Sequence, residues 1–343
     1  MVKIGLQHGT SGAFALGCGY FGNILGPVFH RYTDGYRFAK LASDLIEKHD
    51  FFACKAKIYH LMGHVTIWTQ PIASALEFMR ATFRAATETG DLVSACYGLV
   101  PLIAAFLLRN DPLDAVWRES EIALDLARKT KYRDVVDIIR SQQRFIATMQ
   151  GRTESVSSFN DEQFDEATFE AHMTRDRMSL MIFWYWTLKL KARFMAGDYA
   201  EALGAAEKAK LQLSSSSALI HVLDYVYYSA LTLAASYETV STDQQQAWRE
   251  LLTAHLEQLR EWAENYPPTF GDKHVLVSAE IARLEGRDAD AMHLYEEAIQ
   301  SARENGCLCF RAVVLLLDFL WRQFGYQISM PLSQERKSSF QVC

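Results

Sequence analysis

Two histidines one helical turn apart are the strongest indication of chemistry in the sequence. His60 and His64 stand in the segment HLMGH, and this spacing places both imidazoles on one face of a helix, where they can bind zinc. The metalloprotease form of the motif needs a glutamate after the first histidine as general base, and Leu61 stands there instead. No third ligand is evident in the sequence. Two interpretations stay open: a metal or ligand site around His60 and His64, or two histidines packed among helices.

A second group of polar residues lies in a serine-rich, acidic stretch at residues 151–168. Its carboxylates Asp161, Glu162, Asp165 and Glu166 are close together in the chain, and carboxylate oxygens are ligands for hard cations. A charged, disordered loop is the alternative interpretation, because such compositions bury little apolar surface. The stretch predicts an irregular insertion near residues 151–175 with one short helix near residues 165–173.

The other motifs considered in the sequence do not indicate catalytic machinery. Gly17-x-Gly19-x-x-Gly22 matches a dinucleotide-binding fingerprint by letters, but the preceding dozen residues do not form a strand pattern and nothing downstream resembles a βαβ unit. We interpret these glycines as points of close helix packing. The phosphate-loop, protein-kinase and Gly-x-Ser-x-Gly motifs are absent from the sequence. We therefore predict no catalytic, cofactor-binding or metal-binding residue.

Composition limits the classes of function. The 343 residues carry a formal charge of −6 and show no basic stripe, which argues against a nucleic-acid-binding surface. Six cysteines are scattered, and Cys307-x-Cys309 has no second ligand pair nearby, so we expect reduced thiols and a cytoplasmic protein. Apolar runs such as residues 99–108 are too short to span a bilayer, and the first residues do not form a signal-peptide pattern. We expect no membrane partner.

Helices in pairs must position all of these residues. Only seven prolines and 18 glycines interrupt the chain, which favours helix throughout. The clearest unit is residues 271–302, two helices folded back around the turn at residues 285–288, with small residues and one tyrosine at tetratricopeptide-type offsets. Similar pairs recur along the chain. The predicted repeat-packing positions are Gly35, Ala42, Ser74, Ala81, Ala104, Ala123, Gly197, Tyr199, Ala202, Ala209, Ala279, Gly286, Ala291, Tyr295 and Ala298.

A single helical pair cannot bury its apolar face alone, so recurring pairs must stack. The sequence therefore predicts an all-α fold, a right-handed superhelix of stacked antiparallel helix pairs over residues 1–325, with a loose tail at residues 326–343. Two aromatic groups, residues 183–186 and Tyr225, Tyr227 and Tyr228, either fill the core between helices or face a concave groove that binds a partner.

Several phrases of the sequence together resemble the helical-repeat region of large multidomain sensor kinases. In that family a serine/threonine-kinase-like domain and a P-loop ATPase precede the repeats, and a GAF domain and a histidine kinase follow them. The resemblance covers about residues 5–310 and is carried by TDGYRFAKLASDLIEK, QPIASALEFMRATFRAATETGDLVSACYG, FNDEQFDEATFEA, MAGDYAEALGAAEKA and EIARLEGRDADAMHLYEEAIQSARENG.

The resemblance implies a non-catalytic interaction or scaffold segment of a signalling kinase, truncated or separately encoded, that binds a protein partner or the neighbouring kinase and ATPase domains. No catalytic residue of the family can be placed on this sequence. The alternative is a helical metal- or ligand-binding protein, or a hydrolase, with a site around His60 and His64. Because the apolar residues 14–25 provide no polar cap, we also expect self-association through the ends of the array.

Overall fold

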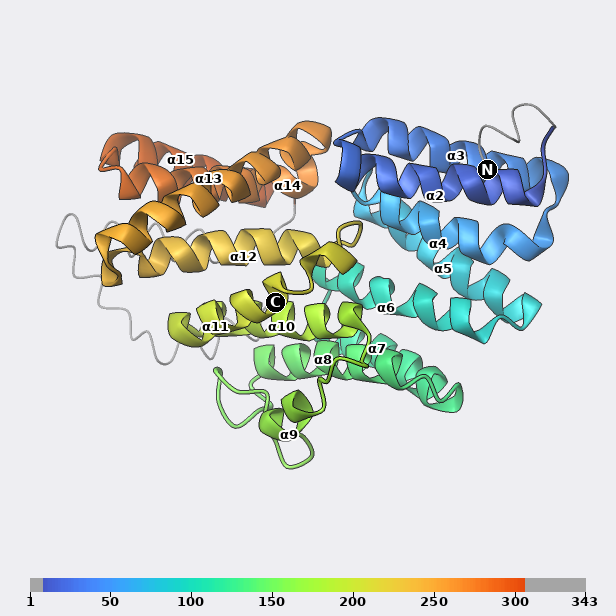
Figure 1. The fold of residues 1–343 in the computed structure, drawn as a ribbon, viewed down its shortest axis with the longest axis horizontal. Helices are drawn as coiled ribbons and strands as arrows, with labels where there is room; N and C mark the ends of the chain where they lie inside the picture. The colour runs from blue at the N-terminus through green and yellow to red at the C-terminus, as the bar shows by residue number, and fades with distance from the viewer. Residues whose placement is uncertain (1–8, 306–343) are drawn as a thin grey trace. The chain divides into compact units, whose positions relative to one another are not determined.

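The computed structural model describes residues 9–305, and within them the fold is all-α (Figure 1). These residues form 14 α-helices, packed in sequential pairs, and three short 3-10 helices. Across the same residues the β-structure is limited to one isolated bridge, between Asp161 and Phe164. The predicted all-α fold of paired helices is confirmed. The predicted tail at residues 326–343, with Cys307, Cys309 and Cys343, lies outside the described residues.

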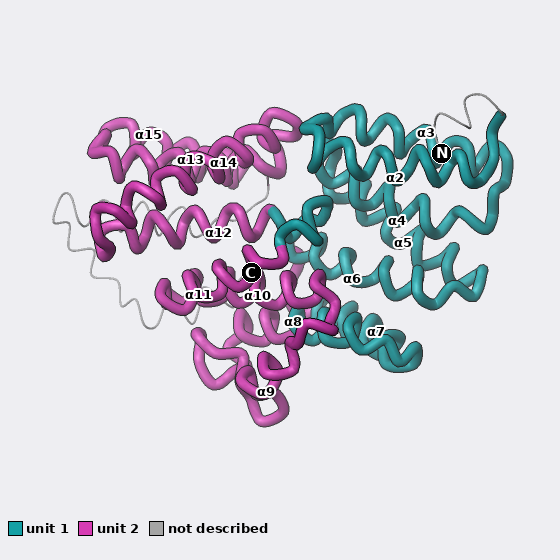
Figure 2. Tube along the Cα trace, viewed as in Figure 1, with its two compact units in different colours: residues 1–109, 115–142, 213–222 teal, residues 110–114, 143–212, 223–343 magenta. Residues whose placement is uncertain are grey.

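The chain divides into two compact units, which Figure 2 distinguishes by colour. The first contains residues 1–109, 115–142 and 213–222, and the second contains residues 110–114, 143–212 and 223–343. The division passes within helices α7 (Leu113–Lys129), α8 (Arg133–Met149) and α12 (His221–Ser236). The helices of the first half of the chain are α2 (Gly12–Phe29), α3 (Tyr32–His49), α4 (Lys55–Thr66), α5 (Ile72–Thr89), α6 (Leu92–Leu108), α7 (Leu113–Lys129) and α8 (Arg133–Met149), with a 3-10 turn at Phe52–Cys54.

The second half of the chain begins with the insertion and continues through six long helices. Among them, α10 (Ser179–Ala196) packs with α11 (Tyr199–Lys210), and α14 (Pro267–Leu284) packs with both α13 (Thr242–Asn265) and α15 (Asp288–Glu304). The elements are α9 (Glu166–Ala171), α10 (Ser179–Ala196), α11 (Tyr199–Lys210), α12 (His221–Ser236), α13 (Thr242–Asn265), α14 (Pro267–Leu284) and α15 (Asp288–Glu304), with 3-10 turns at Leu213–Ser215 and Tyr237–Thr239.

Helices α2 and α3 lie unusually close together, and two glycines make this possible. A methyl group at Gly22 would lie 2.5 Å from the carbonyl oxygen of Gly35, and one at Gly35 would lie 2.6 Å from the carbonyl oxygen of Gly22. Gly19 and Gly26 are also buried on α2, and a methyl group at Gly26 would strike the ring of Tyr32. The glycines of the rejected dinucleotide motif therefore lie within a helix, and the interpretation of Gly19 and Gly22 as close-packing residues is confirmed.

Helix ends follow the local sequence. Gly197 ends α10 with φ +81°, and Gly286 follows α14 with φ +70°. Glycine adopts this left-handed conformation without the steric cost of a Cβ. The predicted turns at these two positions are therefore present. Asp198 then begins α11 by accepting a hydrogen bond from the backbone N–H of Glu201 at 3.3 Å, as expected of an aspartate at a helix start.

Helix α2 contains no charged side chain. Across the residues that the structure describes, it is the one helix long and apolar enough to cross a membrane by length and composition, with a mean hydropathy of 1.2. The 18-residue helix is longer than the apolar runs considered from the sequence alone. Core helices of soluble proteins and signal sequences meet the same criterion, and 44% of this segment is buried inside the structure.

Candidate functional site

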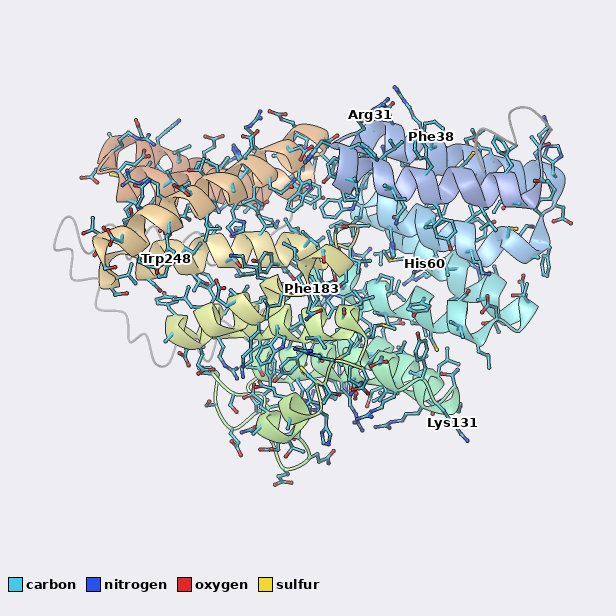
Figure 3. The ribbon with its side chains drawn as sticks, viewed as in Figure 1. Arg31, Phe38, His60, Lys131, Phe183 and Trp248 are labelled. Atoms are coloured by element: carbon cyan, nitrogen blue, oxygen red, sulfur yellow. The ribbon has the colours of Figure 1, made fainter. Side chains whose placement is uncertain are left out.

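The two histidines on α4 lie together, as their spacing predicts. The ring centroids of His60 and His64 are 4.3 Å apart, and His60 is labelled in Figure 3. The ring centroid of Tyr97, on α6, lies 6.1 Å from that of His60. The hydroxyl oxygens of Tyr97 and Tyr132 are 2.5 Å apart. Burial lowers the pKa of His60 to about 4. Burial, and then the neighbouring His60, lowers the pKa of His64 well below its usual value.

These histidines pack among helices of the first unit, where the lowered pKa of each ring favours its neutral form. A neutral imidazole is the form that binds metals, but a structural or catalytic zinc site needs three or four protein ligands. Within residues 9–305, no three His, Cys, Asp or Glu side chains come together in a way that could hold a metal ion. The geometry here is therefore a pair of packed histidines with an adjoining pair of tyrosines.

Most predicted repeat-packing positions are buried between helices. Tyr295 is buried on α15, with alanines on either side of it along the helix. Ser74 and Ala81 are only half-buried, whereas Ala75 and Thr82, one position further along α5, are buried. Tyr199 is half-buried against Phe194, with ring centroids 5.7 Å apart. The other buried members of the set are Gly35, Ala42, Ala104, Ala123, Ala202, Ala209, Ala279, Ala291 and Ala298.

The aromatic groups belong to the core. On α10 the exposed fractions are 0% for Phe183 and Tyr185, 2% for Trp184 and 6% for Trp186. On α12, Tyr225 and Tyr227 are buried as well, whereas Tyr228 is half-buried. Of the two interpretations left open by the sequence, core packing is the one that this burial supports.

The acidic insertion is ordered, which corrects the expectation of a disordered charged loop. Asp161 forms an ion pair with Arg144 of α8, and Asp165 caps α9 through the backbone N–H of Thr168 at 2.7 Å. The predicted short helix is present as α9. Asn160 accepts a hydrogen bond from the backbone N–H of Glu166 at 2.7 Å. Most of these carboxylates are thus engaged by the protein itself, and Glu162 is exposed.

Two cations are buried on the aromatic helix α10 and form the most unusual charged group in the described residues. Arg193 is 2% exposed and Lys189 is 7% exposed. The Nη2 of Arg193 donates to both carboxylate oxygens of Glu166, at 2.5 and 2.7 Å. Lys189 lies 3.4 Å from the same carboxylate. Because a buried charge is costly unless it is paired, α9 is what allows these two cations to lie in the core.

Glu170, one turn after Glu166, completes the cluster. Its Oε1 accepts hydrogen bonds from Lys189 at 2.6 Å and from the hydroxyl of Tyr185 at 2.8 Å. Burial, and then the carboxylates of Glu170 and Glu166, raises the pKa of Tyr185. The exposed Lys208 of α11 lies 3.9 Å from Glu170 and 4.0 Å from the ring centre of Trp186.

Sequence analysis did not find Lys189 and Arg193, although a signal was available. Tyr185, Lys189 and Arg193 recur every four residues on α10 and so share one helical face. Cations inside an otherwise apolar, aromatic helix indicate buried ion pairs with another element. The partners, Glu166 and Glu170, belong to a stretch without helical periodicity, so the sequence alone did not connect them.

A comparison with protein families matches residues 153–319 to a family described as CHK1-like TPR repeats. The match includes the insertion, α10 and the helix pair containing Tyr295.

A relative among curated proteins is the hybrid signal transduction histidine kinase G of Dictyostelium discoideum. It is 26% identical over 157 residues, which are 43% of this chain and 4% of that protein. The resemblance to a repeat region of sensor kinases is therefore confirmed. The chain spans a small part of the relative's length, so the relative's own activity is not transferred to it.

Proposed function

We propose that this chain is a non-catalytic protein-interaction segment of a cytoplasmic signalling kinase, either a part of such a kinase or separately encoded. Its ligand is a protein: a neighbouring kinase or ATPase domain, or a partner in the same pathway. The observation that carries the proposal is the tetratricopeptide region at residues 153–319 together with the partial similarity to a hybrid histidine kinase. Tetratricopeptide repeats generally mediate protein binding through the extended surfaces of stacked helix pairs.

The placement of the candidate chemical residues supports a binding role over an enzymatic one. His60 and His64 lie side by side, and His60 contacts the ring of Tyr97. Asp161 and Glu166 are paired with Arg144 and Arg193. The chemistry expected from these residues is thus used for packing and charge pairing within the fold.

Direct binding to purified kinase parts tests the proposal. We would prepare the kinase-like, ATPase and histidine-kinase domains of a hybrid sensor kinase from the same cell and titrate each against the chain by calorimetry. We expect a dissociation constant of about 1–10 μM for at least one domain, typical of a transient signalling contact. Capture from lysate with identification by mass spectrometry would then reveal further partners.

Metal analysis and activity assays separate this proposal from the alternative. A scaffold is expected to purify without stoichiometric zinc and to show no hydrolysis of ATP or ester substrates above buffer. The His60→Gln/His64→Gln double variant should bind the kinase domains as the parent does. Stoichiometric zinc that this variant loses, together with no binding to any domain at about 100 μM, would establish the metal- or ligand-binding alternative instead.

A further inference from the structure

Helix α9 resembles a bound peptide ligand more than a structural element of the repeat array. It contains six residues, Glu166–Ala171, none of them buried, and isolated helices shorter than about 12 residues are marginal in water. Its helical form therefore depends on its contacts with α10. Those contacts are made by Glu166, Glu170 and Phe169, whose ring centre lies 5.1 Å from that of Tyr185.

The two helices match in spacing. Glu166 and Glu170 are four residues apart on α9, and Lys189 and Arg193 are four residues apart on α10. The two carboxylates and the two cations are thus each separated by one helical turn. Lys189 lies between the carboxylates, 3.4 Å from Glu166 and 2.6 Å from Glu170. Phe159 of the insertion packs on both residues: its ring centre lies 5.1 Å from the guanidinium carbon of Arg193 and 6.0 Å from the ring centre of Tyr185.

From this arrangement we propose that the α10 face formed by Tyr185, Lys189 and Arg193 is a docking surface for an acidic helical segment of a partner protein, and that α9 occupies it in cis. The expected ligand carries two carboxylates four residues apart with an aromatic residue between them. This inference deepens the proposed function, on which it rests, by naming a surface and the chemistry of its partner.

When α9 occupies this face of α10, one buried hydrogen-bond donor of Arg193 has no partner among the described residues. The Nη1 of Arg193 is buried and has no hydrogen-bond partner among the described residues, although Nη2 is bonded twice. A buried donor without a partner destabilises the folded state, because it has lost its hydrogen bonds to water. Lys208, at the exposed rim, is 3.9 Å from Glu170, beyond hydrogen-bonding distance. A ligand with a further acceptor near Arg193 or Lys208 would gain contacts that α9 does not make.

Energetic considerations favour a replaceable contact over a fixed anchor. A buried ion cluster contributes little net stability compared with apolar residues of the same size, because each charge loses its hydration. The buried ion cluster contributes mainly to selectivity, because it favours a ligand that carries the complementary charge. The tether holds α9 near α10 at an effective concentration of about 1 mM, so a partner segment binds when its affinity or local concentration exceeds that of the insertion.

A peptide taken from the chain itself provides the test. We would label a synthetic peptide of residues 158–174 and measure its binding by fluorescence anisotropy to the full chain and to the variant Glu166→Gln/Glu170→Gln, which weakens docking in cis. We expect at least about tenfold tighter binding to the variant. Peptide binding should weaken as salt increases and be lost when the peptide carries the same two glutamines.

A matched control variant is Glu154→Gln/Glu162→Gln, which removes the same charge from exposed positions of the insertion. It should bind the peptide no better than the parent chain. If the Glu166→Gln/Glu170→Gln variant does not fold, hydrogen exchange of the parent chain is measured instead. About 1 mM peptide should accelerate exchange at residues 166–171 by displacing α9.

Two results would overturn the inference. In one, the Glu166→Gln/Glu170→Gln variant folds and hydrogen exchange shows that α9 is released, but the peptide does not bind. The other is a parent chain whose exchange at residues 166–171 is unchanged by excess peptide. Either result would leave α9 as an intramolecular anchor. Because the peptide comes from this chain, such failure is distinct from failure of binding to kinase domains, which would count against the proposed function.

Discussion

Helices α2 and α10 are both rich in apolar residues, yet they are packed in opposite ways. Helix α2 has no charged side chain and approaches α3 through glycines, while Tyr20, Ile24 and Val28 on its other face are 51%, 45% and 55% exposed. Helix α10 contains large aromatic residues and two buried cations, which α9 covers.

The comparison shows two ways of placing a helix that has little polar surface. Close backbone approach requires small residues on one face and fixes the helix spacing sterically, but it provides nothing for the opposite face. Charge pairing requires a second element to satisfy the cations, and that element then covers the helix. We therefore expect α2 to be sensitive to added volume and α10 to be sensitive to the loss of charge.

The largest expected effect is at the charged pair on α10. Arg193→Met keeps much of the side-chain volume but leaves the carboxylate of Glu166 without its main partner. Breaking one side of a buried ion pair costs about 3–5 kcal/mol. We expect a loss of this size in urea unfolding followed by circular dichroism. Adding Glu166→Gln to this variant should recover part of the loss, and a single-variant loss below about 1 kcal/mol would show that this pair is not coupled to folding.

Added volume between α2 and α3 should have the next largest effect. Gly22→Ala places a methyl group 2.5 Å from the carbonyl oxygen of Gly35, so the two backbones must separate. Overpacking of this kind costs about 1–3 kcal/mol, and we expect faster hydrogen exchange along both helices. The control is Gly204→Ala on α11, where a methyl group meets nothing within 4 Å. That substitution should be neutral or stabilise by about 0.5–1 kcal/mol.

These two sites show what the sequence could and could not predict. Helix ends were predictable because Gly197 and Gly286 mark them locally. The packed register of α5 was not, since the pairs Ser74 with Ala81 and Ala75 with Thr82 have the same seven-residue spacing, and only neighbouring helices select between them. The cluster on α10 was missed because Lys189 and Arg193 are paired with residues of an aperiodic insertion, 19 and 27 positions away.

The histidine pair predicts how stability depends on pH. Burial lowers the pKa of His60 to about 4 in the folded chain, whereas an unfolded histidine has a pKa of about 6.5. The unfolded state therefore binds more protons between these values, and stability falls as pH decreases from about 6.5 towards 4. We expect a loss of about 2 kcal/mol from this site after allowance for partial exposure. His255 on α13, whose pKa burial also lowers to about 4, should act in the same direction.

Unfolding temperatures at pH 7 and pH 5 provide the measurement. The His60→Gln/His64→Gln variant should lose less stability between these pH values than the parent chain does. His293→Gln, at an exposed position of α15, is the control and should keep the parent's pH dependence. An unchanged dependence in the double variant would show that these two histidines are not buried as neutral rings.

A smaller effect is expected at Glu280, a buried carboxylate on α14. The hydroxyl of Tyr295 donates to Glu280, which also accepts hydrogen bonds from Arg283 at 2.9 and 3.1 Å. Tyr295→Phe removes one of these donors and leaves the arginine, so we expect a loss of about 1.5 kcal/mol. Unfolding in urea would measure it. A loss close to that of Arg193→Met would mean that the tyrosine, and not the arginine, is the main partner of Glu280.

The open face of α2 should contribute least to folding and most to association. Ile24→Lys/Val28→Lys changes exposed positions, for which effects on stability are usually within about 0.5 kcal/mol. Exposed contiguous apolar side chains favour contact between molecules, so the parent chain should self-associate at high concentration in light scattering and the variant should remain monomeric. Substituting the exposed Leu211 by lysine controls for charge alone and should leave association unchanged. A monomeric parent chain would show that an apolar face of this size, with its other side fixed by glycine packing, is tolerated in water without a partner.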